Sequence, residues 1–388
     1  MTKEKSTVPR LRFPGFTDAW KQRKLGEVVD VCSGRDYKHL EAGSVPVYGT
    51  GGYMLSVSEA LSENVDAIGI GRKGTIDNPY ILKAPFWTVD TLFYCLPKQG
   101  SILEFSYTIF QNINWRSMDE STGVPSLSKV RINNIKVLTP SLQEQEAIGN
   151  FFSDLDQLIT LHQRKLDDVK ELKKALLQKM FPKGNGNDFP QLRFPEFTDA
   201  WKQRKLGEVA EKISQKNLDR QYVETFTNSA EFGIISQRDF FEKNISSLDN
   251  ISGYYIVSPD DFVYNPRISN LAPVGPIKRN KLGRVGVMSP LYTIFRFSDI
   301  HLDFVEKYFD TTIWHRYMEL NGDSGARSDR FAIKDSVFKG LPIPLPTLPE
   351  QEVIGSFFSD LDQLITLHQH QLDHLKLLKK ALLQQMFI

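Results

Sequence analysis

Three glycines in the first third of the sequence have the spacing of a loop that binds a dinucleotide. Residues 69–74 read G-I-G-R-K-G, which matches the pattern G-x-G-x-x-G. Such a loop needs a strand before it and a helix after it, because the helix N-terminus binds the pyrophosphate. A strand over 64–70 fits, but Thr75 is β-branched and Pro79 lacks a backbone donor, so no long helix can follow. The context therefore argues against nucleotide binding.

A second set of residues is similar to the motifs of DNA amino-methyltransferases. Residues 77–80 read D-N-P-Y, which lacks the second proline of D/N-P-P-Y/F. Residues 48–52 read Y-G-T-G-G and could imitate a glycine motif for S-adenosylmethionine. Both stretches occur only in the first half of the chain, and no strand–helix alternation of a doubly wound sheet surrounds them. The pattern does not favour a methyltransferase.

Motifs for other chemistries are missing from the sequence as well. It contains no Walker loop, no HExxH and no paired CxxC. Composition alone leaves a Ser-His-Asp site open, but no motif points to one. We therefore expect no catalytic centre, no bound cofactor and no metal site in this chain.

The glycine turns carry basic and hydroxyl side chains that suit contact with DNA. Glycine lets the backbone approach a large surface closely, and Arg and Thr side chains can reach phosphates or base edges. A structural role in the turn is the alternative for each residue. The predicted DNA contacts of the first half are Thr50, Tyr53, Arg72, Lys73 and Thr75, with Thr122 and Ser126 as further candidates.

A basic patch in the second half supports the same prediction. The region 264–296 contains six basic residues and no acidic one, although the whole chain has 48 basic and 47 acidic residues and a net charge of +1. Global balance argues against indiscriminate coating of nucleic acid but allows local patches. The alternative is a surface loop that happens to be basic. The predicted contacts here are Asn265, Arg267, Ser269, Asn270, Lys278, Arg279 and Arg327.

Length and composition set the broad class. The 388 residues suffice for two or three domains, and 40% hydrophobic and 24% charged residues are typical of a globular protein. No apolar run of about 18 residues predicts a membrane span, and the first residues, MTKEKSTVPR, do not resemble a secretory signal. Cys32 and Cys95 give no disulfide framework. We expect a cytoplasmic protein that does not contact the membrane.

Two segments occur twice and must position these loops. Residues 11–28 and 192–209 differ at one position, as do residues 148–163 and 354–369. The offset grows from 181 to 206 between the two pairs, so the intervening part is 25 residues longer in the second copy. The chain therefore contains two copies of one plan, with a shared frame around unlike inserts.

The two inserts, roughly 29–138 and 210–344, predict mixed α/β structure. Both are rich in β-branched and aromatic residues and are interrupted by Gly, Pro and Asn at short intervals. The expected strands include Val45–Tyr48, Ala67–Ile70, Phe86–Cys95, Tyr254–Val257 and Tyr292–Phe297, and the expected short helices are Ile102–Asn112 and Asp303–Met318.

The shared exits predict two long helices that pair with each other. Apolar residues alternate at spacings of three and four, which is the seam of a coiled coil. About 40 residues at 1.5 Å each give a helix of about 60 Å. Histidines within the seam fix the register, with metal binding as the alternative. The seam residues are Ile148, Phe152, Leu155, Ile159, His162, Leu166 and Val169 in the first helix, and Ile354, Phe358, Leu361, Ile365, His368, Leu372 and Leu375 in the second.

Several phrases of the sequence resemble the specificity subunit of type I restriction–modification systems. In the frame these are W-K-Q-R-K-L-G-E-V, the helix starts P-x-L-x-E-Q-E (140–146 and 346–352) and F-F-S-D-L-D-Q-L-I. In the inserts they are V-Y-G-T-G-G, I-G-R-K-G, P-F-W-T-V-D-T-L-F, T-G-V-P-S-L, V-Y-N-P-R and S-P-L-Y-T-I-F. The resemblance covers essentially the whole chain.

The resemblance implies an α+β fold with an internal pseudo-two-fold repeat. Two mixed α/β target recognition domains would be joined by two long antiparallel coiled-coil helices. The expected parts are a first recognition domain over 1–140, a first helix over 141–182, a linker over 183–191, a second recognition domain over 192–347 and a second helix over 348–388.

The resemblance also implies a function without chemistry of its own. Each domain would read one half of a bipartite site in double-stranded DNA, about one helical turn (~34 Å) apart, and the helices would set the gap. Two methyltransferase subunits would bind the frame and methylate adenine N6 with S-adenosylmethionine that they hold. Two motor–nuclease subunits that use ATP and Mg²⁺ would join for cleavage. The competing interpretations are a self-sufficient methyltransferase and an architectural coiled-coil adaptor.

Overall fold

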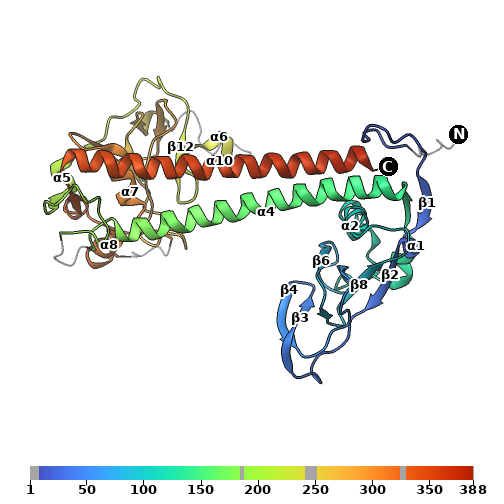
Figure 1. Cartoon of the computed structure of the whole chain (residues 1–388). Coiled ribbons are helices and arrows are strands. Elements are labelled where there is room, and N and C mark those ends of the chain that lie inside the picture. The colour runs from blue at the N-terminus through green and yellow to red at the C-terminus, as the bar shows by residue number, and fades with distance from the viewer. Residues whose placement is uncertain (1–7, 184–187, 241–250, 324–328, 388) are drawn as a thin grey trace. The chain divides into compact units, whose positions relative to one another are not determined.

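The chain divides into two compact units. The computed structural model describes residues 8–183, 188–240, 251–323 and 329–387. Unit 1 contains residues 1–165 and 368–388, and unit 2 contains residues 166–367 (Figure 1). Each unit has one sheet-rich domain and parts of both long helices, which are α4 (Leu142–Lys179) and α10 (Leu348–Met386). The α+β class predicted from the sequence is confirmed.

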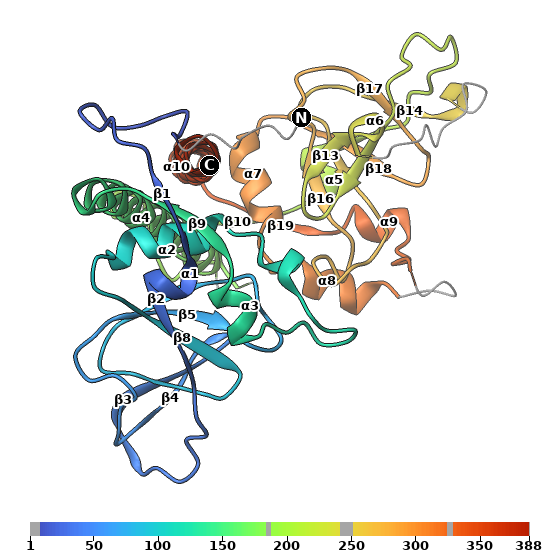
Figure 2. The same cartoon turned by 90° about the vertical axis from the view of Figure 1, so that its right-hand side faces the viewer.

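The domain of unit 1 is built on a four-stranded antiparallel sheet with the strand order β2-β8-β5-β6. Its strands are β2 (Val29–Ser33), β8 (Leu92–Pro97), β5 (Ala67–Gly71) and β6 (Tyr80–Leu82). Every residue of β5 is buried, as expected for a central strand that is covered on both faces. A separate three-stranded sheet contains β4 (Gly52–Val57), β3 (Ala42–Gly49) and β7 (Trp87–Thr88) (Figure 2).

The repeated segments form the part of unit 1 that connects this domain to α4. Strand β1 (Lys21–Lys24) pairs antiparallel with β9 (Lys136–Thr139), and the short helix α1 (Leu25–Val28) follows β1. The remaining elements are α2 (Leu103–Asn112), the 3₁₀ helix η1 (Trp115–Met118) and α3 (Lys129–Asn133).

Unit 2 repeats the plan with different side chains. Its four-stranded sheet has the order β11-β18-β15-β16, and β10 pairs with β19 as β1 pairs with β9. The strands are β10 (Lys202–Lys205), β11 (Ala210–Ile213), β12 (Phe226–Ser229), β13 (Gly233–Ser236), β14 (Tyr255–Val257), β15 (Phe262–Tyr264), β16 (Ile277–Arg279), β17 (Gly286–Met288), β18 (Thr293–Phe297) and β19 (Pro342–Leu345). The helices are α5 (Leu206–Val209), α6 (Gln237–Phe240), η2 (Ile251–Gly253), α7 (Leu302–Phe309), α8 (His315–Asn321) and α9 (Asp335–Phe338).

The two sheets correspond strand by strand although the inserts do not align in sequence. The shared order makes β5 equivalent to β15 and β6 equivalent to β16, and α2 corresponds to α7. Both helices are followed by a buried tryptophan whose indole N–H donates to a carbonyl near the helix end. Trp115 donates to Phe110 O at 2.8 Å, and Trp314 donates to Phe309 O at 3.2 Å.

The same polar contacts hold the start of each long helix. Arg12 donates to both carboxylate oxygens of Glu144, at 2.6 and 2.7 Å, and Arg193 does the same with Glu350, at 2.7 Å to each oxygen. One residue further on, a glutamine side chain accepts a backbone N–H that precedes the domain helix. Gln145 accepts from Ile102 and Gln351 accepts from His301, both at 3.1 Å. The shared sequence thus makes one common attachment for two different domains.

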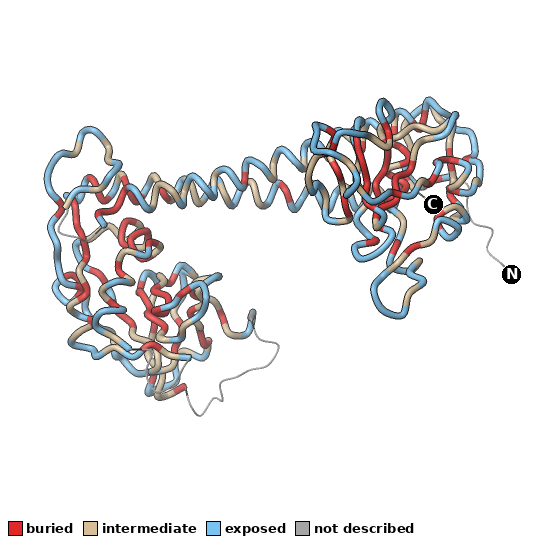
Figure 3. Tube along the Cα trace, turned by 90° about the horizontal axis from the view of Figure 1, so that it is seen from below, coloured by how far each residue is buried: buried red, intermediate tan, exposed pale blue. Residues whose placement is uncertain are grey.

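Within each unit, α4 and α10 run antiparallel. In unit 1 Lys379 donates to Asp156, and in unit 2 Lys173 donates to Asp362, both at 2.5 Å. The predicted seam residues are all buried or half-buried. Red and tan segments recur between pale blue ones along the long helices (Figure 3). His162 and His368 lie in unit 1 with ring centroids 5.8 Å apart. The burial of the seam residues agrees with pairing of the two long helices within each unit.

Each long helix leads into a phenylalanine that completes an aromatic core. In unit 1 Phe387 stacks on Phe105, with ring centroids 5.8 Å apart, and meets the edge of Trp20 at the same distance. In unit 2 Phe181 is buried against Phe304 and Trp201, at 5.4 and 5.9 Å. The end of one long helix therefore belongs to the core of the domain at which the other long helix starts.

Two elements differ from the sequence-based expectation. The region 86–95 is not one strand, because a turn in which Leu92 N donates to Val89 O (3.0 Å) separates β7 from β8. The helix expected over 303–318 is two helices, α7 and α8. The Thr311 hydroxyl and backbone N–H both donate to Tyr308 O, at 2.7 and 3.0 Å, which closes a turn at the end of α7, and β-branched residues follow.

Candidate nucleic-acid interface

Two loops that are distant in sequence meet in the domain of unit 1. We call residues 72–75, which follow β5, and residues 122–127 the first loop pair. Lys73 and Ser126 form an antiparallel bridge. On either side of it, Gly74 N donates to Pro125 O and Leu127 N donates to Arg72 O, both at 2.9 Å. Five of the predicted contacts, Arg72, Lys73, Thr75, Thr122 and Ser126, are thus brought together.

The glycines of the G-x-G-x-x-G stretch shape this loop. A Cβ on Gly71 would lie 1.9 Å from Thr75 O, so the backbone can fold back only on glycine. Gly74 has φ +89°, which is unfavourable for other residues. No helix follows β5, as predicted, because the chain turns into β6. The glycines therefore shape a tight loop between two strands.

The D-N-P-Y stretch has a structural role in the same domain. The Asp77 carboxylate pairs with Arg116 at 2.5 Å, and Pro79 O accepts from Tyr107. The Tyr80 hydroxyl donates to Gly49 O at 2.6 Å, and burial raises the pKa of Tyr80. These contacts tie β6 and the residues before it to neighbouring elements.

The hairpin turn between β3 and β4 lies beside the first loop pair. A Cβ on Gly74 would lie 4.0 Å from Thr50 Oγ1, which places this predicted contact next to the loop. Tyr53 is 63% exposed, with its ring edge-on to Tyr48 and its hydroxyl 3.2 Å from Ser56 Oγ. Thr50, which is half-buried, therefore lies next to the loop pair, and Tyr53 is exposed on the same hairpin.

The basic side chains of the first loop pair differ in how they are held. Arg72 is exposed, but its guanidinium lies 5.8 Å from the centre of the Phe93 ring and donates weakly to Asp90 O at 3.4 Å. Lys73 is exposed and makes no ion pair with a described residue. The Asp119 carboxylate accepts Ser126 N–H at 2.9 Å, and backbone donors lower the pKa of Asp119. The loop is thus fixed by its backbone while Lys73 is free to reach outward.

Unit 2 contains a second loop pair at the equivalent place. It consists of residues 266–269, which follow β15, and residues 329–331. Arg267 and Arg330 form the antiparallel bridge. Ile268 N donates to Asp329 O at 3.1 Å and Phe331 N donates to Pro266 O at 2.8 Å. The hydrogen bonds repeat those of the first loop pair position by position.

The other predicted contacts near this loop are divided between surface and interior. Arg267, Ser269 and Asn270 are exposed. Asn265 is 7% exposed, because its amide donates to Asn228 O at 2.8 Å and its carbonyl accepts Arg267 N–H at 3.0 Å. Asn265 therefore acts as a turn residue, and Arg327 lies outside the described residues.

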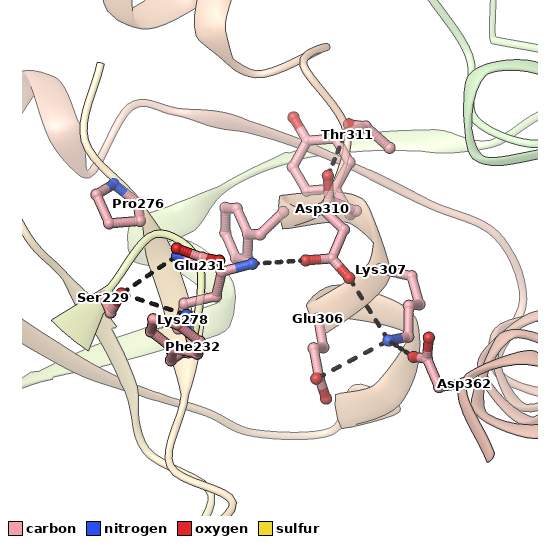
Figure 4. A network of polar contacts seen from close by, with 12 residues as sticks. Ser229, Glu231, Phe232, Pro276, Lys278, Glu306, Lys307, Asp310, Thr311 and Asp362 are labelled. Carbon is pink, nitrogen blue, oxygen red and sulfur yellow. Dashed lines mark hydrogen bonds and ion pairs between the residues drawn. The ribbon is translucent and has the colours of Figure 1, made fainter. Parts of the chain in front are cut away.

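The basic patch of residues 264–296 is largely neutralised by acidic residues from elsewhere. Lys278 donates to Asp310 at 2.9 Å (Figure 4). Arg279 is 14% exposed and pairs with Asp260 and Asp303, at 2.5 and 2.6 Å. Burial acts to lower the pKa of Arg279, but these carboxylates outweigh it and raise the pKa. Further pairs are Lys281–Glu306, Arg284–Glu224 and Arg296–Asp261. Of the six basic residues, only Arg267 has no ion pair with a described residue.

Sequence analysis did not identify Arg330, although it lies opposite Arg267. Its Nε is buried without a hydrogen-bond partner among the described residues, while the side chain is 32% exposed. One sequence pattern could have indicated Arg330. In each half, a polar residue precedes an apolar one in the segment before β9 or β19, as in Ser126-Leu127 and Arg330-Phe331. That signal has meaning only after the strands have been matched.

Neither a cluster of metal-binding side chains nor a membrane-spanning helix occurs among the described residues. There, no group of three His, Cys, Asp or Glu side chains lies close enough to hold a metal ion. None of the described helices combines the length and apolarity needed to cross a membrane.

Fold and loops together define a duplicated protein with two sheet domains on a shared helical frame, each presenting a loop pair. The family model for the type I restriction modification DNA specificity domain matches residues 17–171 and 198–377, once in each repeat. The chain therefore belongs to the type I restriction–modification DNA specificity family. Specificity subunits are the non-catalytic components of type I systems, which agrees with the search for catalytic motifs.

Known relatives extend over most of the chain. It is 24% identical over 334 residues to the type I restriction enzyme MjaVIII specificity subunit of Methanocaldococcus jannaschii, covering 82% of this chain and 75% of the relative. It is 26% identical over 292 residues to the putative MjaX specificity subunit of the same organism, covering 71% of this chain but only 63% of the relative. The crystal structure of a type I S subunit from M. genitalium has the same fold, with a TM-score of 0.66 at 13% identity over 98% of this chain and 99% of that one.

Proposed function

We propose that each sheet domain reads one half of a bipartite site in double-stranded DNA through its loop pair. The observation that carries the proposal is the equivalence of the two loop pairs. Their backbone hydrogen bonds repeat, whereas their side chains differ, with Lys73 and Ser126 in one and Arg267 and Arg330 in the other. A constant backbone with variable polar side chains suits two readers of two different sequences.

We propose that the paired helices set the gap between the half-sites. The Lys379–Asp156 and Lys173–Asp362 pairs support this role, because each fixes the register of α4 against α10 within its own unit. Insertion of whole turns into both helices should widen the gap and leave the half-sites unchanged. Methylome sequencing of such a variant is the measurement, and altered half-sites with the original gap would contradict the role.

We propose that the frame also binds two copies of a methyltransferase subunit. Exposed leucines support this role, because they recur at an offset of 206 and so present the same apolar side chains in both units. Two identical surfaces suit two copies of one partner. The leucines are Leu142, Leu158 and Leu161 in unit 1, and Leu348, Leu364 and Leu367 in unit 2.

The cofactors of the complex would then belong to the partners. S-adenosylmethionine would be held by the methyltransferase subunits, and ATP with Mg²⁺ by the motor–nuclease subunits where these join. Incubation of the purified chain alone with DNA and labelled S-adenosylmethionine tests this division. Methyl transfer without the partner would contradict it.

Binding to DNA is tested with the chain in complex with its methyltransferase partner. Selection from a random DNA library, followed by sequencing, should give a bipartite site with a fixed gap. Specific binding should persist at salt concentrations that remove non-specific binding. An architectural adaptor would instead select no sequence.

A further inference from the structure

We propose that the two bridge positions of each loop pair, 73 with 126 and 267 with 330, are the equivalent specificity-determining positions of the two domains. The inference rests on the proposed function and adds to it the residues that distinguish the half-sites. It assigns a role to Arg330 and Ser126 as partners of Arg267 and Lys73.

The equivalence is geometric. In both domains the first position follows the central strand, β5 or β15, and the second lies on the segment that leads to α3 or α9. The two positions face each other in an antiparallel bridge, which brings their Cβ atoms to about 4.5–5.5 Å. Two side chains at that distance on one surface can contact the same base pair or neighbouring ones.

The chemistry of the two positions differs between the domains. The domain of unit 1 (domain 1) presents an ammonium at Lys73 and a hydroxyl at Ser126. The domain of unit 2 (domain 2) presents guanidinium groups at Arg267 and Arg330. A guanidinium is a planar fork that donates two parallel hydrogen bonds, which matches O6 and N7 of guanine. A lysine ammonium is a point charge, and a serine hydroxyl can both donate and accept. The two domains therefore select different bases at equivalent places.

The Arg330 side chain is 32% exposed and has no close ion pair with a described residue. Its contact with Asp329 is 3.9 Å long, too far for a hydrogen bond, and its Nε has no partner among the described residues. Beside it is an open groove of about 920 Å³ that is also lined by Thr293, Asn321 and Lys334. By contrast, Lys278 and Arg279 have their charges satisfied within the domain. The bridge arginines are thus the basic groups of this loop that remain able to bind a ligand.

Exchange of the bridge residues between the domains tests the inference. One variant places the residues of domain 2 in domain 1 (K73R with S126R), and the other makes the reverse change (R267K with R330S). Each is purified with the methyltransferase partner and used for selection from a random DNA library. We expect each variant to change base preference at one half-site by roughly tenfold or more, with the other half-site and the gap unchanged.

A charge-matched control separates base reading from general attraction. K98R with Q99R makes the same change of net charge as K73R with S126R and also introduces two arginines, at exposed positions at the opposite end of β8. It should leave both half-sites unaltered. A uniform change in affinity over all sequences, stronger for K73R with S126R and weaker for R267K with R330S, would show phosphate contacts only and would overturn the inference, as would unaltered base preference.

Two further measurements cover folding failure and the guanine assignment. The single variants K73R and R267K change only exposed side chains and keep the test available if the double variants do not fold. Replacement of guanine by 7-deazaguanine in the half-site of domain 2 should weaken wild-type binding roughly tenfold at the contacted position, because N7 is lost. No weakening at any guanine would overturn the role of the arginine fork. If the wild-type complex selects no bipartite site at all, the proposed function fails instead.

Discussion

The two units meet the same aspartate of the frame in different ways. In unit 1 Asp156 of α4 pairs with Lys379, and its second oxygen accepts from the Gln111 amide at 3.1 Å. In unit 2 Asp362 of α10 pairs with Lys173, but its second oxygen accepts from the Lys307 ammonium at 2.5 Å. The frame residues are identical, so the difference comes from the inserts alone.

The unit 2 contact is part of a buried ion network. Lys307 is 2% exposed and lies between Asp362, Asp310 and Glu306 (Figure 4). Burial acts to lower the pKa of Lys307, but the neighbouring carboxylates outweigh it and raise the pKa. The equivalent position in unit 1 is Thr108, whose hydroxyl bonds to its own helix at Glu104 O. One domain is therefore attached by charge and the other by a neutral amide.

The comparison teaches how one frame can hold unlike domains. Its other attachment points accept backbone groups, as when Gln145 accepts Ile102 N–H and Gln351 accepts His301 N–H. Backbone contacts place no demand on the insert's side chains, and the aspartate accepts either an amide or an ammonium. This tolerance supports the hypothesis that inserts are exchanged by recombination within the matching segments, without disturbing assembly.

The largest expected difference follows from removal of the buried ammonium. Lys307→Met leaves the carboxylates of Asp310 and Asp362 with one partner each and should destabilise unit 2 by about 3 kcal/mol. Thr108→Val is the matched change in unit 1 and should cost less than about 1 kcal/mol. Hydrogen exchange of the α7 and α2 amides in the intact chain measures both, and equal effects would contradict the distinction.

The close approach of each domain helix to its long helix gives a second contrast. A Cβ on Gly149 would lie 2.7 Å from Phe105 N, which is backbone and cannot move aside. On Gly355 the nearest atom is His301 Nδ1 at 2.6 Å, a side-chain atom, and the equivalent backbone atom, Phe304 N, is further away at 3.0 Å. Gly149→Ala should cost about 2 kcal/mol and Gly355→Ala about 1 kcal/mol. Pulse proteolysis in urea can rank them, and the reverse order would refute the explanation.

Removal of the lysine that pairs α4 with α10 should also affect the two units unequally, by less than removal of Lys307 and with unit 1 as the more sensitive unit. After Lys379→Met, Asp156 retains only the Gln111 amide, whereas after Lys173→Met, Asp362 retains Lys307. The expected losses are about 1–2 kcal/mol for Lys379→Met and less than about 1 kcal/mol for Lys173→Met. Thermal unfolding of the two variants provides the comparison. A larger loss for Lys173→Met would show that Lys307 does not compensate.

A fall in pH should have the smallest of these effects on stability, and it should act on the ion network of unit 2. Burial acts to raise the pKa of Asp310, but Lys278 and Lys307 outweigh it, so the folded pKa lies below the ordinary value of 3.8. Its stabilisation is therefore complete above that ordinary value and is lost as the pH falls through the lower folded pKa. Gln111, the equivalent residue of unit 1, has no charge to lose. Protection of α7 amides should fall more steeply with acid than protection of α2 amides, and parallel curves would count against this.

Some of the candidate site could be predicted from sequence because it depends on local chemistry. Gly71 and Gly74 indicate a tight loop, and the adjacent Arg72 and Lys73 are indeed exposed on it. The frame and both long helices followed from near-identical repeats and from the seam spacing. A helix break after Phe309 was missed, because α7 ends in a local turn, where the Thr311 side chain and backbone both bond to Tyr308 O, within an otherwise helical pattern.

The basic patch shows why counting along the chain is insufficient. Residues 264–296 lack acidic residues, yet Asp310, Glu224 and Asp261 reach the patch from outside that window. Charge pairs form in space, so a window of sequence cannot contain their partners. The second loop pair was hidden for a related reason. It matches the first through backbone hydrogen bonds, to which side-chain identity contributes little.

Phe387, which follows α10 and completes the aromatic core of unit 1, links the order of synthesis to the order of folding. The core of the N-terminal domain contains Met386 and Phe387. We therefore expect that this core is completed only after residue 387 has been synthesised. Residues 166–367 of unit 2 are made earlier and without interruption. A stop codon shortly after residue 367 would therefore damage the domain that was translated first and spare the one translated last.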